Sequence, residues 1–264
     1  MTALVRTVEE RDGAWLRIVL DRPPGNLLSL EMVRQLAAAI GHEVAAGPSI
    51  PLRAGRKWIT IEGAGAHFSY GAMIQEHVPG PMEQVLAATH ALLRQLMALP
   101  CATAALVQGR CLGAAFELAL ACDLIIADAD ASLGLPEIAI GAFPPAGAAL
   151  LPWRVGAARA AEAILSGTAR TAIEWREAGA VSIVASAGRA IDAAGEWFDA
   201  HLAGRSSVAV AAAAEASRLI LRASVEPAIA AAERLYLERV LPTHDASEGV
   251  KAFVEKRRPD WKNA

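Results

Sequence analysis

The chain has 264 residues, of which 54% are hydrophobic, 25 are Lys or Arg and 28 are Asp or Glu, giving a net charge of -3. The apolar fraction exceeds the roughly 45–50% of ordinary soluble domains, which excludes a chain that is mostly disordered. The near balance of charges, with no stripe of basic residues, excludes recognition of a nucleic-acid backbone. We therefore expect one large α/β unit with a substantial core.

Neither a targeting segment nor a membrane span is predicted. Residues Met1–Glu10 lack the apolar stretch and cleavage site of a secretory signal, and apolar stretches such as Val208–Ala214 are too short to cross a bilayer. Cys101, Cys111 and Cys122 form no CxxC pair and have no histidine at zinc-ligand spacing. The sequence predicts a soluble cytoplasmic protein with buried, reduced thiols and no metal site.

Strands and helices alternate over most of the chain, which favours the α/β class. Asp12-Gly13 is typical of a tight hairpin, Ser29 of a helix cap, and Pro100 of a helix end. Hydrophobic periodicity predicts strands over 4–10, 14–20, 58–62, 103–107, 124–127 and 181–184, helices over 30–44, 82–99, 114–122 and 172–178, and a turn-rich segment over 47–55. From about Arg189 the pattern is helical, so we expect a core over residues 1–200 and a helical region over 201–264.

Common site motifs are absent from the sequence. Gly63-x-Gly65 is followed by Phe68, where the dinucleotide fingerprint needs a third glycine. The chain also has no GxxxxGK[ST], HExxH or GxSxG segment, which argues against nucleotide hydrolysis, metalloprotease and serine-hydrolase chemistry. The six histidines are scattered, and we interpret each as a surface or packing residue.

Two glycine-containing segments, residues 66–72 and 109–117, place backbone N–H groups at turns, where they can face a developing negative charge. Glu117 lies in an otherwise apolar helix, where an ionised carboxylate is costly unless it is paired, hydrated or catalytic. Twenty residues further on, Glu137 follows a proline in a predicted loop. Together they are a candidate acid/base pair, and the alternative is that both are ordinary solvated glutamates.

Five fragments in chain order resemble the crotonase, or enoyl-CoA hydratase/isomerase, superfamily. They are Leu20-Asp21-Arg22-Pro23 with Asn26, Phe68-Ser69-x-Gly71-Ala72, Gly109-x-x-Leu112-Gly113-Ala114-Ala115-x-Glu117, Gly134-x-Pro136-Glu137-Ile138, and Glu248-Gly249-x-x-Ala252-Phe253-x-Glu255-Lys256-Arg257. The resemblance implies a spiral of ββα turns with a C-terminal helical trimerisation region. It also implies assembly as a homotrimer or a dimer of trimers.

The resemblance assigns the reacting groups to four residues. The amides of Ala72 and Ala114 match an oxyanion hole for the thioester oxygen of an acyl-CoA, where fixed donors stabilise an enolate. Glu117 and Glu137 match both glutamates of the hydratases, one acting on water and the other delivering a proton to carbon. Because both are present, hydration is favoured over isomerisation. No separate cofactor is implied, since coenzyme A enters as part of the substrate.

The resemblance also implies how the rest of the substrate is held. Coenzyme A contacts are expected from Arg22, Phe68, Tyr70, Phe253 and Lys256, the last two often reaching a neighbouring subunit in this superfamily. Lys256 is the stronger candidate of those two.

The acyl pocket is expected to include Met73, Phe116, Phe143 and Pro145, with Tyr70 as a further candidate. Pro145 stands where hydratases commonly have a glycine, so no amide N–H is available there to help hold water. Alanines at 114 and 115 replace further glycines, which changes the expected pocket shape.

Strings around residues 68–79, 108–113 and 141–145 look most like one branch of the superfamily, the cyclohexa-1,5-diene-1-carbonyl-CoA hydratases. This branch-level resemblance implies a hydro-lyase that adds water to a cyclic dienoyl-CoA. An ordinary enoyl-CoA hydratase or isomerase is the alternative within the superfamily. A non-catalytic CoA-ester binding protein is the alternative from another class.

Overall fold

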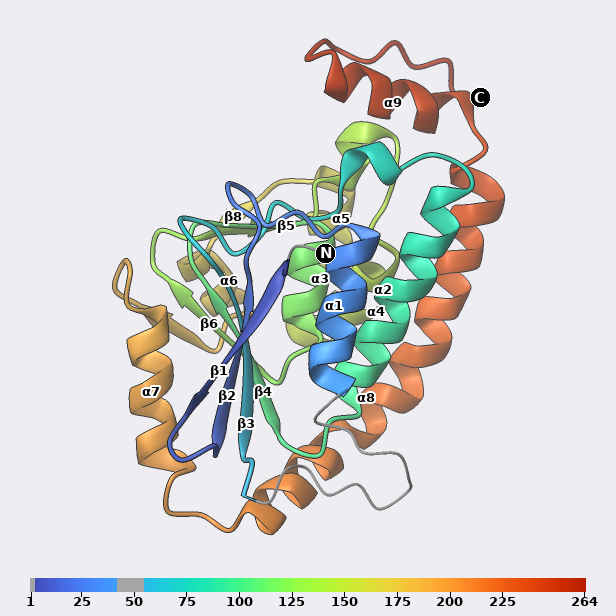
Figure 1. Cartoon of the computed structure of the whole chain (residues 1–264). Helices are drawn as coiled ribbons and strands as arrows, with labels where there is room; N and C mark the ends of the chain where they lie inside the picture. The colour runs from blue at the N-terminus through green and yellow to red at the C-terminus, as the bar shows by residue number, and fades with distance from the viewer. Residues whose placement is uncertain (1–2, 42–54) are drawn as a thin grey trace.

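The computed structural model describes residues 3–41 and 55–264, and within them the chain forms two sheets flanked by helices (Figure 1). The larger sheet has the order β1 (Val5–Glu10), β2 (Trp15–Leu20), β3 (Trp58–Gly63), β4 (Ala102–Val107), β6 (Leu124–Asp128) and β9 (Ile183–Ala185). The smaller sheet has the order β5 (Arg110–Leu112), β7 (Ser132–Gly134) and β8 (Arg170–Thr171).

The helices fall on both sides of the larger sheet, with α1, α2 and α8 on one side and α7 on the other (Figure 1). In chain order they are α1 (Leu30–Gly41), α2 (Pro81–Met97), α3 (Ala114–Leu120), α4 (Pro145–Val155), α5 (Ala157–Ser166), α6 (Ala172–Ala178), α7 (Ala190–His201), α8 (Ser207–Leu235) and α9 (His244–Val254). Shorter segments are the 3-10 turns η1 (Ile74–Glu76) and η2 (Glu137–Ile140) and the π-helical η3 (Tyr236–Val240).

Local sequence signals account for several element boundaries. The predicted hairpin is confirmed: β1 and β2 are antiparallel, and Asp12 and Gly13 adopt positive φ between them. The Ser29 hydroxyl accepts a hydrogen bond from the Met32 amide at 3.3 Å and so caps α1. Thr171 and Glu174 form the reciprocal capping box of α6.

Parallel pairing produces the predicted spiral of ββα turns, which is confirmed. β2, β3, β4, β6 and β9 pair in parallel, so each strand after β2 must be reached by a crossover. One turn of the spiral runs through β4, β5 and α3, and the next runs through β6, β7 and the η2–α4 segment. Each turn therefore contributes one strand to each sheet.

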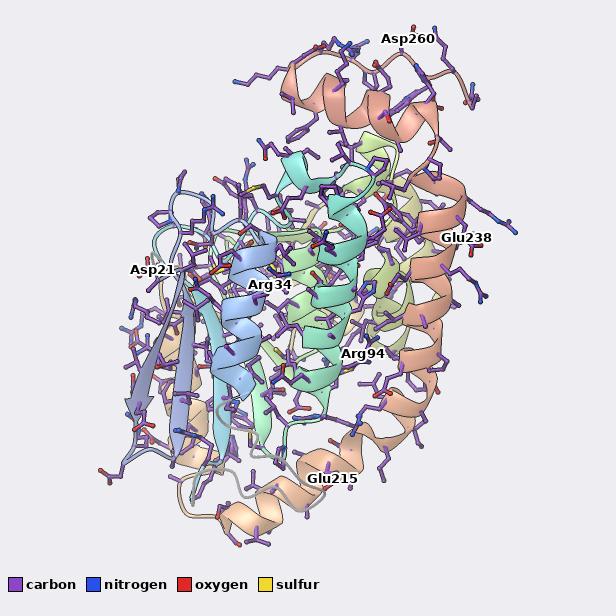
Figure 2. All side chains as sticks on the ribbon, turned by 45° about the vertical axis from the view of Figure 1, so that its right-hand side comes forward. Asp21, Arg34, Arg94, Glu215, Glu238 and Asp260 are labelled. Carbon is purple, nitrogen blue, oxygen red and sulfur yellow. The ribbon has the colours of Figure 1, made fainter. Side chains whose placement is uncertain are left out.

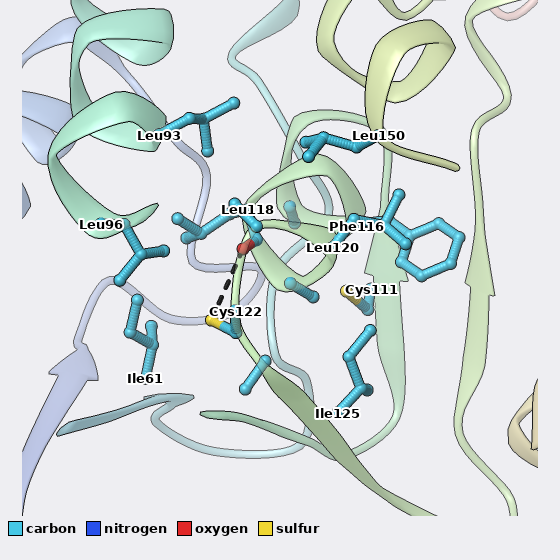
Figure 3. Close-up of a cluster of buried hydrophobic side chains, with 14 of the residues drawn as sticks. Ile61, Leu93, Leu96, Cys111, Phe116, Leu118, Leu120, Cys122, Ile125 and Leu150 are labelled. Atoms are coloured by element: carbon cyan, nitrogen blue, oxygen red, sulfur yellow. Dashed lines mark hydrogen bonds between the residues drawn. The ribbon is translucent and has the colours of Figure 1, made fainter. Parts of the chain in front are cut away.

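The core lies between the larger sheet and the helices on its α1–α2 side. Leu93 and Leu96 of α2, Leu118 of α3 and Leu150 of α4 meet there and are at most 2% exposed (Figure 3). Burying a leucine contributes about 1.5–3 kcal/mol. The three cysteines are buried and free, as predicted; the Sγ of Cys122 lies 3.6 Å from the carbonyl oxygen of Leu118. A second core, under α7, stacks Trp15, Trp58 and Phe198.

Some elements differ from the sequence-based prediction. The helix expected to reach Val44 is described only to Gly41, and most of the turn-rich segment 47–55 also lies outside the described residues. Helices α4 and α5 were not predicted, because α4 starts at a Pro-Pro pair and contains Pro152. The last strand begins two residues late, because the amides of Ala180 and Val181 still bond the carbonyl oxygen of Trp175.

The C-terminal part is helical, as predicted: every described element after residue 201 is a helix. α8 has 29 residues, yet none of the helices that the structure describes is long and apolar enough to span a membrane. α9 stands beyond the body of the chain in Figure 1 and packs against η2.

Candidate active site

The smaller sheet brings three distant segments to one place. Ser69 forms a parallel bridge with Cys111, and Cys111 pairs in parallel with Leu133 of β7. Parallel strands deliver their carboxyl ends to the same edge, so the residues that follow these three positions emerge together. Those residues include Ala72, Ala114 and Glu137.

The first of these segments is held by Asn26. Its side-chain amide donates to the carbonyl oxygens of Ala64, His67 and Phe68 at 2.9–3.1 Å, and its own carbonyl accepts from the Ser69 hydroxyl at 2.8 Å. Asn26 is fully buried, so these bonds are shielded from water. The loop before Ala72 is thereby fixed in position.

Two backbone amides, those of Ala72 and Ala114, lie at this edge of the smaller sheet. The bridge between Leu28 and Ala72 uses the carbonyl of Gly71 and the amide of Met73, which leaves the amide of Ala72 with no acceptor among the described residues. The amide of Ala114, at the start of α3, likewise has none in the described part of the chain. A Cβ at Gly71 would lie 3.6 Å from the Ala114 nitrogen, so the two segments are adjacent.

Glu117 lies in the first turn of α3 and is only 4% exposed. Its Oε1 accepts a hydrogen bond of 2.7 Å from the amide of Gly147, in the first turn of α4. Burial raises the pKa of Glu117, while His90 and the amides of Gly147 and Ala146 act in the opposite direction. The start of α4 therefore favours the ionised form of this carboxyl.

Glu137 has a different environment. Its Oε2 is buried and has no hydrogen-bond partner among the described residues. Burial and the negative charge of Glu117 raise the pKa of Glu137 to about 8, against a smaller opposing effect of its own backbone amide. At neutral pH this carboxyl is mostly protonated and can act as a donor.

Gly113 joins the two halves of the site. It adopts a φ of +56°, and a Cβ there would lie 2.8 Å from Oε1 of Glu137. Its amide donates to the carbonyl of Gly134 at 2.9 Å, which ties the start of α3 to the strand before Glu137. A glycine is needed at this position for both its φ and its space. The site thus pairs two interacting carboxyls with two amides that no described residue accepts from, an arrangement suited to proton transfer beside a developing oxyanion.

Comparison with known proteins agrees with this arrangement. Residues 10–264 match the family described as enoyl-CoA hydratase/isomerase. The chain belongs to the enoyl-CoA hydratase/isomerase family. It is accordingly an enzyme of the hydro-lyase type, and the family implies an acyl-CoA substrate.

Individual relatives of this family member cover nearly its whole length. Cyclohexa-1,5-dienecarbonyl-CoA hydratase from Thauera aromatica is 37% identical over 254 residues, which are 96% of this chain and 95% of that protein. 2,3-dehydroadipyl-CoA hydratase from Escherichia coli K12 is 32% identical over 97% of this chain and 98% of that protein. The crystal structure of an enoyl-CoA hydratase from Mycobacterium avium subsp. paratuberculosis K-10 has a TM-score of 0.85 at 27% identity, covering 99% of this chain and all of that one.

The residues expected to line the acyl pocket of this hydratase-family site are only partly brought together. Met73 is partly buried and precedes η1, and Pro145 is buried as the first residue of α4. Phe143 packs edge-on against Tyr236 with ring centroids 5.5 Å apart. Phe116 is 0% exposed and packs against Trp175 in the core, so it presents no open surface in the single chain.

The expected coenzyme A contacts are dispersed in the single chain. Phe68 is 0% exposed and belongs to the core. Tyr70 is exposed and contacts both the His67 ring and the Arg110 guanidinium.

Different elements hold the other three expected coenzyme A contacts, Arg22, Phe253 and Lys256. The guanidinium of Arg22 donates to the Ser29 hydroxyl at 3.1 Å, beside the cap of α1. Phe253 and Lys256 are exposed at the end of α9 and just beyond it.

Three further features of this enzyme's site were not predicted. Pro145 has no N–H, and the amides of Ala146 and Gly147, which follow it, donate to the Glu117 carboxyl instead. Tyr236 lies beside Glu137, and burial together with that charge raises the pKa of Tyr236 to about 12. His90, interpreted as a packing residue, is buried near Glu117. The one sequence signal for a role of His90 in the site was its position on the apolar face of a predicted helix.

No three His, Cys, Asp or Glu side chains gather as a metal-binding group within residues 3–41 and 55–264.

Proposed function

We propose that the enzyme adds water to a conjugated cyclic dienoyl-CoA, cyclohexa-1,5-diene-1-carbonyl-CoA. The observation that carries this proposal is the pair of interacting carboxyls, Glu117 and Glu137, beside two amides that have no acceptor among the described residues. The choice of acyl group is supported by the 37% identity to the Thauera aromatica hydratase, whose name gives this compound as its substrate.

The amides of Ala72 and Ala114 serve as the oxyanion hole in this proposal. They donate to the thioester oxygen, which becomes negative when a nucleophile adds to the conjugated system. Losing one such donor typically costs about 2.7–4 kcal/mol of transition-state stabilisation. Because these donors are backbone groups fixed by the smaller sheet, they need no reorganisation during the reaction.

The two carboxyls divide the proton transfers according to their environments. Glu117, supported by the amides at the start of α4, is the base that takes a proton from water. The hydroxide oxygen bonds to the carbon β to the thioester, and the displaced electron pair spreads over the diene and the thioester oxygen. Glu137, with its raised pKa, then delivers its proton to the far end of the diene. The product is a 6-hydroxycyclohex-1-ene-1-carbonyl-CoA.

A flat ring substrate is consistent with the aromatic side chains next to Glu137. Tyr236 lies beside this carboxyl and meets Phe143 edge-on. We assign Phe143, Met73 and Pro145 to the acyl pocket, with Phe116 supporting it from the core. An aromatic wall offers apolar area of fixed shape, which favours a planar ring over a flexible chain.

The assay that tests the function compares cyclohexa-1,5-diene-1-carbonyl-CoA with crotonyl-CoA in ¹⁸O-labelled water, with products identified by mass and retention. We expect one labelled oxygen in the ring product and little turnover of crotonyl-CoA. Preference for crotonyl-CoA would make the enzyme an ordinary enoyl-CoA hydratase. A shifted double bond without labelled oxygen would indicate an isomerase, and binding by calorimetry without turnover of either ester would indicate a CoA-ester binder.

We also propose that the region over residues 201–264 assembles the enzyme as a homotrimer or a dimer of trimers. Large apolar side chains are exposed along α8 and α9 in the single chain, among them Val208 at 78%, Ile220 at 71% and Phe253 at 60%. Such a surface favours burial against another subunit. Light scattering of the purified protein measures the oligomeric mass directly, and a monomer would contradict the assignment.

In such an assembly, the exposed Phe253 and Lys256 can contact coenzyme A on a neighbouring subunit, while Arg22 and Tyr70 contribute from the subunit that holds the thioester; the ring of Phe68 supports this region from the core. We expect Lys256→Ala to raise KM for the acyl-CoA while leaving kcat nearly unchanged, since uniform binding is lost. An unchanged KM would contradict this contact.

A further inference from the structure

Glu76 carries a carboxyl close to the candidate site that the mechanism above does not use. It ends η1, four residues after Ala72, and is half-buried. Both of its side-chain oxygens lie near the amide nitrogen of Leu30, the first residue of α1, at 3.1 and 3.4 Å. The first amides of a helix have no acceptor within the helix, so this carboxyl supplies the one that Leu30 needs. Figure 2 shows η1 next to the start of α1, the helix that carries the labelled Arg34.

The direction of the Ala72 N–H follows from the hydrogen bond beside it. The carbonyl of Gly71 accepts from the Leu28 amide at 2.9 Å. That carbonyl and the Ala72 N–H belong to one trans peptide and point in opposite directions, so the N–H points away from Leu28. On the other side of this segment lies β5, which is joined to it by the bridge between Ser69 and Cys111. Rotation of this peptide would turn the donor away from the thioester oxygen.

The two segments are held together less firmly just after Ala72. The Met73 amide donates to the Leu28 carbonyl at 3.4 Å, which is long for a backbone hydrogen bond. The next bond along the chain is the one from the Leu30 amide to the Glu76 carboxyl. The η1 turn links that carboxyl back toward Ala72, because the Glu76 amide donates to the Met73 carbonyl at 3.0 Å.

We propose that Glu76 is a positioning residue that holds the Ala72 amide in its place in the oxyanion hole. The inference rests on the proposed function, because it concerns a donor assigned there. A hydrogen bond weakens steeply when its distance or angle is lost, so an oxyanion donor must be held in position. The donor itself is a backbone group that no substitution removes cleanly, and Glu76 is a side chain through which its position can be changed.

The first experiment probes the oxyanion hole with an unreactive ring thioester, 4-(dimethylamino)benzoyl-CoA. Its amino group and thioester carbonyl are conjugated through the ring, so hydrogen bonds to the carbonyl oxygen shift its long-wavelength absorption to the red. At saturating probe, we expect a smaller red shift in Glu76→Ala than in the unsubstituted enzyme. Glu76→Gln keeps a side-chain oxygen as acceptor and should give the full shift.

Turnover of the dienoyl-CoA should follow the same order. Loss of one oxyanion donor lowers kcat by about 10²–10³-fold, and a donor that is displaced rather than removed should cost less, about tenfold in Glu76→Ala. KM should change little, because the charge on the thioester oxygen develops in the transition state. Glu76→Gln should keep nearly full kcat.

The matched control is Glu83→Ala. Glu83 is exposed and accepts a hydrogen bond of 2.6 Å from the Gly80 amide at the start of α2, so it makes the same kind of bond at another helix. Its loss should lower the melting temperature and leave the absorption shift and kcat unchanged. If Glu76→Ala behaves in the same way, Glu76 is an ordinary helix cap and the inference is wrong. An equal loss of the shift in Glu76→Gln and Glu76→Ala would also contradict it, because the acceptor oxygen would then have no part.

Glu76→Asp decides the question if Glu76→Ala does not fold. Its side chain is shorter by one carbon, so the carboxyl is drawn back from the Leu30 amide and the red shift should again be smaller. A full shift in a folded Glu76→Asp would contradict the inference.

The probe also separates this inference from the proposed function. If the unsubstituted enzyme binds the probe without a red shift, the oxyanion hole is absent, and the proposed function fails together with the inference. If the full shift persists in Glu76→Ala, only the role of Glu76 fails. A shift that depends on Glu76 supports the inference even where the hydration assay fails.

Discussion

Two acidic sites stand at opposite ends of α3, one half-buried and one buried, and their carboxyl groups have very different numbers of hydrogen-bond partners. Beyond the end of the helix, Asp123 accepts from the Thr103 amide at 2.8 Å, from the Thr103 hydroxyl at 3.1 Å and from both Nε and Nη2 of Arg218. Arg218 also donates to the carbonyls of Leu99 and Cys101.

At the start of the helix, Glu117 accepts a hydrogen bond of 2.7 Å from the amide of Gly147, and Glu137 has a buried oxygen with no partner in the described part of the chain. A buried charge with a complete set of partners stabilises one structure, whereas an incomplete set leaves hydrogen-bonding capacity for a substrate and water. The Asp123 cluster therefore belongs to the fold, and the Glu117–Glu137 pair belongs to the chemistry.

The largest expected effect is on turnover. Glu117→Gln and Glu137→Gln should each lower kcat by about 10²–10⁴-fold, because each removes a general acid or base. The melting temperature should not fall, since a neutral amide relieves the repulsion between two buried carboxyls. Steady-state kinetics and thermal unfolding measure the two quantities, and the exposed Asp130→Asn is the control. Full activity in both variants would show that the Glu117–Glu137 pair is not catalytic.

A substitution in the other acidic site, at Asp123, should lower the free energy of unfolding. Asp123→Asn leaves the guanidinium of Arg218, only 3% exposed, without its carboxylate. Leaving a buried charge such as this guanidinium without its partner costs about 3–5 kcal/mol of unfolding free energy. Urea denaturation measures that loss, and kcat per folded molecule should be retained. A loss below about 1 kcal/mol would mean that the Asp123 cluster is no more structural than the active-site pair.

The pH dependence should report Glu137 in its protonated form. Because the pKa of Glu137 is raised to about 8, kcat/KM should fall above that pH by about tenfold per unit as the proton donor is lost.

Stability should depend on the same group. Between the ordinary carboxyl pKa of 4.5 and about 8, the folded chain holds a proton that the unfolded chain has released, so this group's contribution to stability is lost as pH rises through that window. Chemical denaturation at several pH values should show a smaller fall for Glu137→Gln. An equal fall in both proteins would show that another group is responsible.

The smallest expected effect is a loss of stability in the Asp123 cluster. Thr103→Ala removes a hydroxyl that donates to Asp123 and accepts from the Asp123 amide at 3.0 Å. Each of these two hydrogen bonds contributes about 0.5–1.5 kcal/mol, and the rest of the cluster remains in place. Denaturant unfolding should show a loss of about 1–3 kcal/mol with unchanged kcat. A change in kcat would show that the two ends of α3 are coupled.

Much of the fold could be predicted because its signals are local. The Asp12-Gly13 turn, the Ser29 cap and the helix end before Pro100 each depend on the conformational preferences of a few neighbouring residues. The same reasoning failed for α4, where a proline start and an internal proline hide a helix that tertiary packing stabilises. It also missed the strands of the smaller sheet, which at two or three residues are too short for any periodicity.

The sequence by itself determined the family, the α/β class, and the identity of Glu117 and Glu137 as the acidic pair of interest. Only the tertiary structure decided how those two carboxyls differ. The amides of Gly147 and Ala146 come from α4 and His90 comes from α2, and all three oppose the effect of burial on the pKa of Glu117 but not on that of Glu137. Protonation depends on burial and on charges within a few ångströms, and those distances exist only after the spiral has closed.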